Sequence, residues 1–200
     1  AVDWCRAVLP RLGLRTDGEF EWMPERPWLN KRLTEQGFEA GLRWVVLCPG
    51  TRWPSKQWPV EYFEQLMGEL AGGSVRFAVV GSGAEKILGK RLAGRKDCVD
   101  LTGKTTLPEM TEWLRASSVV VTNDSGPMHV AAAVGTPVIA LFGPTNASKT
   151  GPYHARGTVL AADSKDCAAC ARGLSYRAEG CDCMRSIAPT TVAEAVAACE

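Results

Sequence analysis

The chain has 200 residues, of which 46% are hydrophobic and 22% are charged, and its formal net charge is +1. This is the composition of an ordinary globular protein with one substantial domain, or with one domain and an appendage. The near-neutral charge gives no bulk signal for binding nucleic acid or an acidic membrane. No apolar run approaches the ~20 residues that a membrane-spanning helix needs.

The first 41 residues differ from the rest of the chain. They contain several prolines and tryptophans and no clear strand pattern. We expect two short helices here, at 2–9 and 28–39, joined by an irregular segment. The start has neither a Met nor a basic region followed by an apolar run, so we expect no signal peptide and interpret the chain as a piece of a longer protein. Residues 1–41 are predicted to be a linker or the tail of a domain that precedes them.

From residue 42 onwards, short apolar runs alternate with helical patterns. We predict helices at 59–71, 84–93, 108–116, 127–134 and 189–199. We predict strands at 43–48, 75–83 (with a glycine turn at its end), 99–101, 119–122, 138–142 and 159–161. Continuous apolar strands that alternate with helices indicate a parallel sheet covered on both faces. The predicted fold class is α/β, a Rossmann-like doubly wound parallel sheet over 42–188, closed by a C-terminal helix at 189–200.

Ligands of such sheets bind beyond the carboxyl ends of the strands, so the loops there carry the functional information. The loop "PGTRWPSKQWP" follows the first strand. Gly50 allows close approach of the backbone to a ligand, and Thr51 offers a hydroxyl. Arg52 and Lys56 offer positive charge suited to phosphate. The alternative is a solvated basic loop with two tryptophans packed beneath it.

The loops after the second and third strands are less specific. In "GSGAEK" the third glycine of the dinucleotide fingerprint is replaced by Lys86. Glu85 could accept hydrogen bonds from both hydroxyls of a ribose, or it could simply stabilise the start of a helix. In "LTGKTTLPE" the residues from Gly103 to Thr106 form a polar loop. Either Thr106 or a neighbour caps the following helix, or the loop contacts a base.

The fourth loop, "TNDSG" at 122–126, is the most informative one. It runs into a helix whose first N–H groups have no partner within the helix and whose dipole favours an anion. Gly126 leaves room above these amides. We expect the Asp124 carboxylate to accept hydrogen bonds from the turn and so to fix its shape, with simple helix capping as the alternative. His129, in the first helical turn, is expected to be a neutral hydrogen-bond donor, or else a satisfied, partly buried histidine.

The stretch "NDSGPMHVAAAVGTPVIALFGPTNASKTGPY" resembles the donor-site signature of glycosyltransferase family 9, the ADP-heptose:lipopolysaccharide heptosyltransferases. "PGTRWPSKQWP" and "LTGKTTLPEM" resemble the family's other motifs in order and spacing. The resemblance covers residues 43–199. It implies the carboxy-terminal, nucleotide-sugar-binding half of a GT-B glycosyltransferase, in which two Rossmann-like domains enclose a cleft.

The resemblance also implies roles for individual residues. Thr51, Arg52 and Lys56 would contact the diphosphate and the sugar. Glu85 would bind the ribose and Thr105 would lie along the adenine pocket. The pyrophosphate and donor sugar would be held by Asp124, Ser125, Gly126 and His129. Of these residues, Lys56 and Asp124 are predicted to be catalytic.

The family's reaction, by resemblance, is inverting and needs no metal or other cofactor: an acceptor hydroxyl attacks the anomeric carbon of an ADP-sugar as ADP leaves. Lys56 and the amides of Ser125 and Gly126 would stabilise the developing charge. The general base and the lipid A–core acceptor site would lie in an amino-terminal domain. We therefore expect these 200 residues to bind nucleotide but to transfer sugar poorly. The expected location is the cytoplasm or the cytoplasmic face of the inner membrane, with no nucleic-acid partner.

Eight cysteines are dispersed along the chain. Four of them, Cys167, Cys170, Cys181 and Cys183, form two close pairs that could bind zinc. The second pair has a single residue between its members, which departs from the usual zinc-ribbon spacing. Reduced thiols in a cytosolic protein are the simpler interpretation, so we predict no metal site.

Three other functions compete with the donor domain of a heptosyltransferase. One is the donor domain of another GT-B transferase or epimerase that uses a UDP-sugar. Another is a stand-alone nucleotide-binding module. The third is an NAD-dependent oxidoreductase, which the incomplete glycine fingerprint disfavours.

Overall fold

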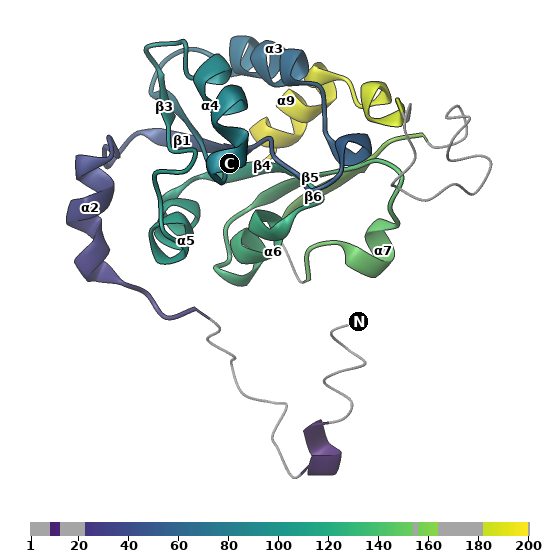
Figure 1. The fold of residues 1–200 in the computed structure, drawn as a ribbon, viewed down its shortest axis with the longest axis horizontal. Helices are drawn as coiled ribbons and strands as arrows, with labels where there is room; N and C mark the ends of the chain where they lie inside the picture. The colour runs from purple at the N-terminus through teal and green to yellow at the C-terminus, as the bar shows by residue number, and fades with distance from the viewer. Residues whose placement is uncertain (1–8, 13–22, 154–155, 164–181, 200) are drawn as a thin grey trace.

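A computed structural model describes residues 9–12, 23–153, 156–163 and 182–199. Its centre is a parallel sheet of six strands in the order β3-β2-β1-β4-β5-β6 (Figure 1). Their bounds are β1 Arg43–Cys48, β2 Val75–Val79, β3 Cys98–Asp100, β4 Val119–Asn123, β5 Val138–Phe142 and β6 Gly157–Ala161. The strand order reverses between β1 and β4, which makes this the topological switch point of the sheet.

Helices cover the sheet on both faces (Figure 1). The α-helices are α2 Asn30–Glu35, α3 Val60–Leu70, α4 Lys86–Leu92, α5 Leu107–Ala116, α6 Gly126–Ala133, α7 Ala147–Thr150 and α9 Pro189–Ala197. Short 3-10 helices are η1 Leu9–Leu12, η2 Pro27–Leu29, η3 Pro54–Lys56, η4 Gly83–Glu85 and η6 Cys183–Ser186.

Each face of the sheet has its own hydrophobic core. Val45 and Leu47 of β1 pack with Phe63 of α3 and with side chains of α4 and α9. The alternate residues of the same strand, including Val46, pack on the other face with Trp113 of α5 and with side chains of α6. Because successive strand residues point to opposite faces, a strand buried on both sides must be apolar throughout. This is why the central strands read as continuous hydrophobic runs.

The predicted fold class is confirmed: the chain forms a doubly wound α/β sheet with every predicted strand present. Boundaries differ by one or two residues in most elements. The sequence patterns missed the short elements η3, α7 and η6, because a helix of three or four residues has no hydrophobic period of its own. Most of the helix predicted at 2–9 lies outside the described residues.

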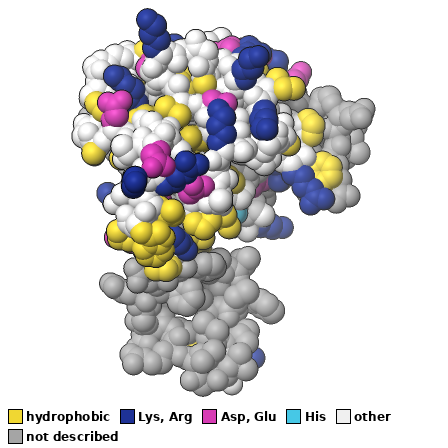
Figure 2. Space-filling model, turned by 60° about the vertical axis from the view of Figure 1, so that its left-hand side comes forward, with side chains coloured by type: hydrophobic (Ala, Val, Ile, Leu, Met, Phe, Trp, Pro, Cys, Tyr) yellow, Lys and Arg dark blue, Asp and Glu magenta, His cyan; other side chains and the backbone are white. Residues whose placement is uncertain are grey.

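Residues 23–41 pack against the sheet domain through α2. Leu33 is 2% exposed and joins the core that contains Trp44 and Trp113. No helix among the described residues is long and apolar enough to cross a membrane. Figure 2 shows basic and acidic side chains interspersed over one face of the described part of the protein.

Candidate functional site

A cavity of about 570 Å³ lies at the carboxyl ends of the central strands. Side chains and backbone from the four loops that follow β1, β2, β3 and β4 line it, so the predicted convergence of these loops on one side of the sheet is confirmed. The lining includes Thr51, Arg52, Glu85, Thr105, Ser125 and Gly126 from the predicted site. The cavity thus lies where the strand order reverses, the usual place for a ligand in an open α/β sheet.

The loop after β1 is fastened to the end of β4 by a buried asparagine. The Asn123 side chain donates from Nδ2 to the Pro49 carbonyl at 2.8 Å and accepts at Oδ1 from the Trp58 N–H at 3.1 Å. Trp58 is fully buried, and its ring N–H donates to the Ile187 carbonyl at 2.9 Å. Sequence reasoning missed Asn123, although a polar residue at the end of an otherwise apolar strand was a usable signal.

A largely buried ion pair joins the two loops at the switch point. Lys56 Nζ lies 2.7 Å from Asp124 Oδ2, and the two side chains are 14% and 9% exposed. The same carboxylate oxygen accepts a hydrogen bond from Thr145 Oγ1 at 2.8 Å, and the Asp124 carbonyl accepts one from Thr51 Oγ1 at 3.3 Å. Asp124 therefore links the loops that follow β1, β4 and β5.

The alternative of Asp124 as a simple helix cap is wrong, because Ser125 occupies the N-cap position of α6. The sequence predicts that the Asp124 carboxylate accepts hydrogen bonds from its own turn. Its bonding partners, however, come from the neighbouring loops: they are the side chains of Lys56 and Thr145. The sequence alone did not single out Thr145, which lies in the loop after β5.

Two glycines hold the Glu85 side chain at the ends of β1 and β2. A Cβ atom added at Gly50 would lie 2.5 Å from Glu85 Cγ, and one added at Gly81 would lie 3.0 Å from Glu85 Cβ. Ser82 Oγ donates to Glu85 Oε2 at 2.6 Å. The carboxylate is half-buried and lines the cavity. Any side chain at position 50 would have to displace it.

Two helices start at the cavity with different capping. At α5, Thr106 and Glu109 form a capping box: the Thr106 N–H donates to Glu109 Oε2 at 2.6 Å, and Thr106 Oγ1 accepts from the Glu109 N–H at 3.4 Å. The predicted capping role of Thr106 is thus confirmed. At α6, the N-cap Ser125 makes no side-chain cap bond, and the first turn holds no acidic residue. The start of α6 therefore has no capping side chain, and Ser125, Gly126 and Pro127 line the cavity there.

The cavity lining does not include three of the predicted site residues, which are Lys56, Asp124 and His129. Thr105 is half-buried in the wall of the cavity. The Arg52 guanidinium is exposed and lies 5.4 Å from the centre of the Trp53 ring. His129 is also exposed, in the first turn of α6, so the alternative of a partly buried, satisfied histidine is wrong.

Two cysteines bear on the chemistry. Burial raises the pKa of the Cys48 thiol, at the cavity wall, to about 12, so it stays protonated at neutral pH and is not a nucleophile there. Of the cysteines considered for zinc, Cys167, Cys170 and Cys181 lie outside the described residues, and Cys183 is buried. The described part of the chain contains no cluster of three or more His, Cys, Asp or Glu side chains that could hold a metal ion.

Comparisons with known proteins agree with this geometry. The chain is 36% identical over 138 residues to lipooligosaccharide heptosyltransferase 2 of Haemophilus influenzae, an alignment that covers 65% of this chain and 40% of that protein. It therefore spans less than half the length of that relative.

Solved heptosyltransferases share the fold. The structure of E. coli ADP-heptose lps heptosyltransferase II superposes with a TM-score of 0.73 at 23% identity, over 94% of this chain and 56% of that one. E. coli heptosyltransferase WaaC, solved with ADP, superposes with a TM-score of 0.63 at 24% identity, over 84% of this chain and 47% of that one. The profile of glycosyltransferase family 9 (heptosyltransferase) matches residues 5–177. The chain belongs to glycosyltransferase family 9, the heptosyltransferase family.

Proposed function

We propose that this chain is the donor-binding part of a heptosyltransferase and that its cavity binds an ADP-sugar such as ADP-heptose. The observation that carries the proposal is the cavity at the switch point, which combines an uncapped helix start with a carboxylate held between two glycines. Family membership supports the same assignment. The solved relatives, one of them with ADP, support the choice of nucleotide.

The cavity offers a complementary group for each part of the donor. The amides of Ser125 and Gly126 suit the diphosphate, since a helix start without its own acid attracts an anion. The Glu85 carboxylate suits the ribose, because one carboxylate can accept hydrogen bonds from two neighbouring hydroxyls. The side chains of Leu107 and Met110, together with Thr105, line the part of the wall left for the base.

Sugar transfer demands stabilisation of the charge that develops on the departing diphosphate. We assign this to Lys56, with Asp124 holding the lysine at the switch point, and to the α6 amides. Thr51 and Arg52 lie on the same loop, where they would contact the phosphates or the sugar, and His129 would donate to the sugar or phosphate. An acceptor in the lipopolysaccharide core, bound by a further domain at the cytoplasmic face of the inner membrane, completes the proposed reaction.

Titration of the 200-residue chain with ADP, UDP and NAD, followed by calorimetry and thermal shift, tests the nucleotide. ADP is expected to raise the melting temperature, with UDP and NAD having little effect. Tighter binding of UDP would favour a UDP-sugar enzyme, and tighter binding of NAD would favour an oxidoreductase. We expect the chain alone to transfer heptose poorly, and strong transfer by it would contradict the assignment of the general base to another domain.

A further inference from the structure

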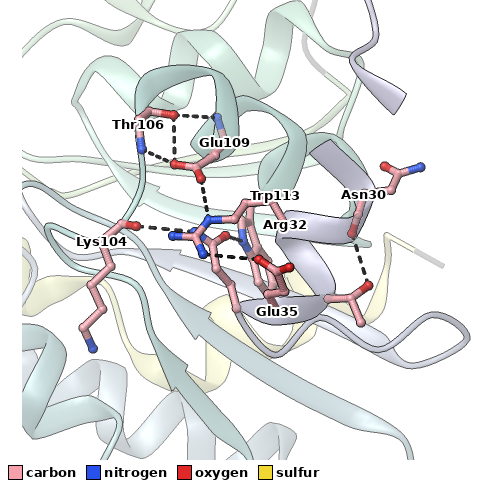
Figure 3. A network of polar contacts seen from close by, with 9 residues as sticks. Asn30, Arg32, Glu35, Lys104, Thr106, Glu109 and Trp113 are labelled. Atoms are coloured by element: carbon pink, nitrogen blue, oxygen red, sulfur yellow. Dashed lines mark hydrogen bonds and ion pairs between the residues drawn. The ribbon is translucent and has the colours of Figure 1, made fainter. Parts of the chain in front are cut away.

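A side-chain network connects α2 to the wall of the cavity (Figure 3). Arg32 Nε donates to Glu109 Oε1 at 2.9 Å. The other carboxylate oxygen, Glu109 Oε2, accepts from the N–H and the hydroxyl of Thr106 at 2.6 and 2.9 Å. Because Thr106 lines the cavity, Arg32 is separated from the wall by a single carboxylate.

A second contact runs from α2 to the loop between β3 and α5. Gln36, the C-cap residue of α2, donates from Nε2 to the Lys104 carbonyl at 3.4 Å and accepts at Oε1 from Trp113 Nε1 at 2.7 Å. Residues four apart on a helix lie on the same face, so Arg32 and Gln36 reach the loop together. The loop between β3 and α5 is thus held from outside at two points.

The other end of this loop is fixed independently. The Gly103 N–H donates to the Gly81 carbonyl at 2.9 Å, which attaches the start of the loop to the end of β2. In the half that faces the base region, Thr106 is bonded to Glu109, with Arg32 behind it, and its carbonyl accepts from the Met110 N–H at 2.9 Å. Contacts from α2 therefore act on the part of the cavity that we assign to the base.

Glu109 and Arg32 differ in how deeply they are buried, and this makes Arg32 the better residue to substitute. Glu109 is 8% exposed and is fixed between its bonds, whereas the Arg32 side chain is 49% exposed. Removal of the Arg32 side chain leaves the hydrophobic core intact and withdraws one donor from Glu109. Leu33, the buried residue next to Arg32, keeps α2 anchored in the core.

We propose that Arg32 and Gln36 are positioning residues that hold Thr105 and Thr106 against the nucleotide base, so that α2 sets the selectivity of the cavity for its base. The inference rests on the proposed function, because it assumes that a nucleoside diphosphate occupies the cavity. Neither residue touches the nucleotide: each acts through the loop. The ratio of UDP to ADP dissociation constants is the readout that separates this role from a general weakening of the fold.

The test is Arg32→Ala in the 200-residue chain, with ADP and UDP dissociation constants measured by calorimetric competition. We expect the ADP dissociation constant to rise about 3- to 10-fold, with a smaller change for UDP, so that the ratio falls. Arg32→Lys, which keeps one donor and the charge, is expected to recover part of the ratio. The matched control is Arg91→Ala, since the Arg91 side chain is 47% exposed, much as that of Arg32 is, and pairs with Glu64 at 2.6 Å between α4 and α3.

Each outcome has one meaning. An unchanged ratio in Arg32→Ala, or an equal change in the Arg91→Ala control, overturns the positioning role while leaving ADP binding in place. Failure of the wild-type chain to bind ADP overturns the proposed function itself, and the inference falls with it. A melting temperature of Arg32→Ala close to that of the wild type shows that the change in ratio does not arise from unfolding.

Discussion

The starts of α5 and α6 border the same cavity and differ in how they satisfy their free amides. Both have a proline at one of their first two positions. The first turn of α5 carries Glu109, which closes a capping box with Thr106, whereas α6 has neither an acid in its first turn nor a side-chain cap. A helix start that supplies its own carboxylate repels a phosphate, and one that lacks it attracts a phosphate.

This difference in capping suggests which way round a nucleotide would lie in the cavity. Under the proposed function, the diphosphate lies at α6, near the Lys56–Asp124 pair, and the base lies at α5, where apolar side chains such as Leu107 line the wall. The hydrogen bond from the Thr106 N–H, together with Arg32, holds the pKa of Glu109 below its usual value, so this carboxylate stays charged at neutral pH. The start of α5 is therefore closed by its own side chains, whereas the start of α6 is open.

Gly126→Val should have the largest effect on ADP binding, because its side chain fills the space above the open start of α6. A Cβ atom at position 126 would meet no atom within 4 Å, so the fold should tolerate the change. The ADP dissociation constant is expected to rise at least about 30-fold as charge-assisted hydrogen bonds are lost. Calorimetry and a melting curve measure the two effects. Gly68→Val on α3, where a Cβ atom also meets nothing within 4 Å, is the control, and an equal loss of affinity there would refute the interpretation.

Charge reversal at Lys56 tests which role the buried ion pair has. Lys56→Glu should raise the ADP dissociation constant about 10- to 30-fold. It should also lower the free energy of unfolding by about 3 kcal/mol, since Asp124 is left buried beside a second acid.

The comparison variant is Asp124→Asn, which keeps the shape of the side chain and an oxygen that accepts hydrogen bonds. It should bind ADP nearly as well as the wild type. If both variants lose ADP affinity to the same extent, the pair only fixes the loops and Lys56 does not serve the diphosphate. Lys90→Glu, at an exposed position on α4, controls for net charge.

Glu85→Gln tests whether the ribose of the nucleotide lies at Glu85, between the two helix starts. The variant keeps the size of the side chain between Gly50 and Gly81 but loses the charge and one acceptor. We expect about tenfold weaker binding of ADP and a much smaller change for 2′-deoxy-ADP, measured by competition. An equal loss for the two nucleotides would place the ribose elsewhere.

Thr106→Ala should weaken ADP binding less than the variants above, about 3- to 10-fold as for Arg32→Ala, and should also weaken the closed helix start. Loss of an N-cap threonine costs about 1 kcal/mol of stability. Because the pKa of Glu109 is lower in the folded state, its contribution is present at neutral pH and is lost as the pH falls through that lowered pKa. Urea unfolding at neutral and acidic pH should therefore show a smaller acid-induced loss of stability in the variant than in the wild type. A loss of equal size would contradict the contribution of the capping box.

The sheet and the positions of its loops could be predicted from the sequence more completely than the contacts between the loops. Continuous apolar strands such as 43–48 require burial on both faces, and this requirement predicts a doubly wound sheet without knowledge of any contact. The pairing of Lys56 with Asp124 joins residues 68 positions apart, and Thr145 reaches Asp124 from a third loop. No local pattern encodes such contacts, because they depend on the order of strands in the sheet.

The same reason explains why the sequence did not predict the contacts of α2. Its six residues give a weak helical period, and its contacts with α5 through Arg32 and Glu109 span 77 positions. The capping box within 106–109, in contrast, is local and was predicted as a capping threonine. Local chemistry was therefore readable from the sequence, whereas the partners of Arg32, Lys56 and Asp124 became known only from the fold.

The most direct test of the account is an ADP titration of the ¹⁵N-labelled chain, with amide chemical shifts followed at the two helix starts. The account predicts that the Gly126 and Ser125 amides shift most, in the direction expected for a hydrogen bond to phosphate, while the Thr106 amide, already bonded to Glu109, shifts little. Shifts concentrated at Thr106, or at residues outside the cavity, would contradict the assignment of the diphosphate to the open start of α6.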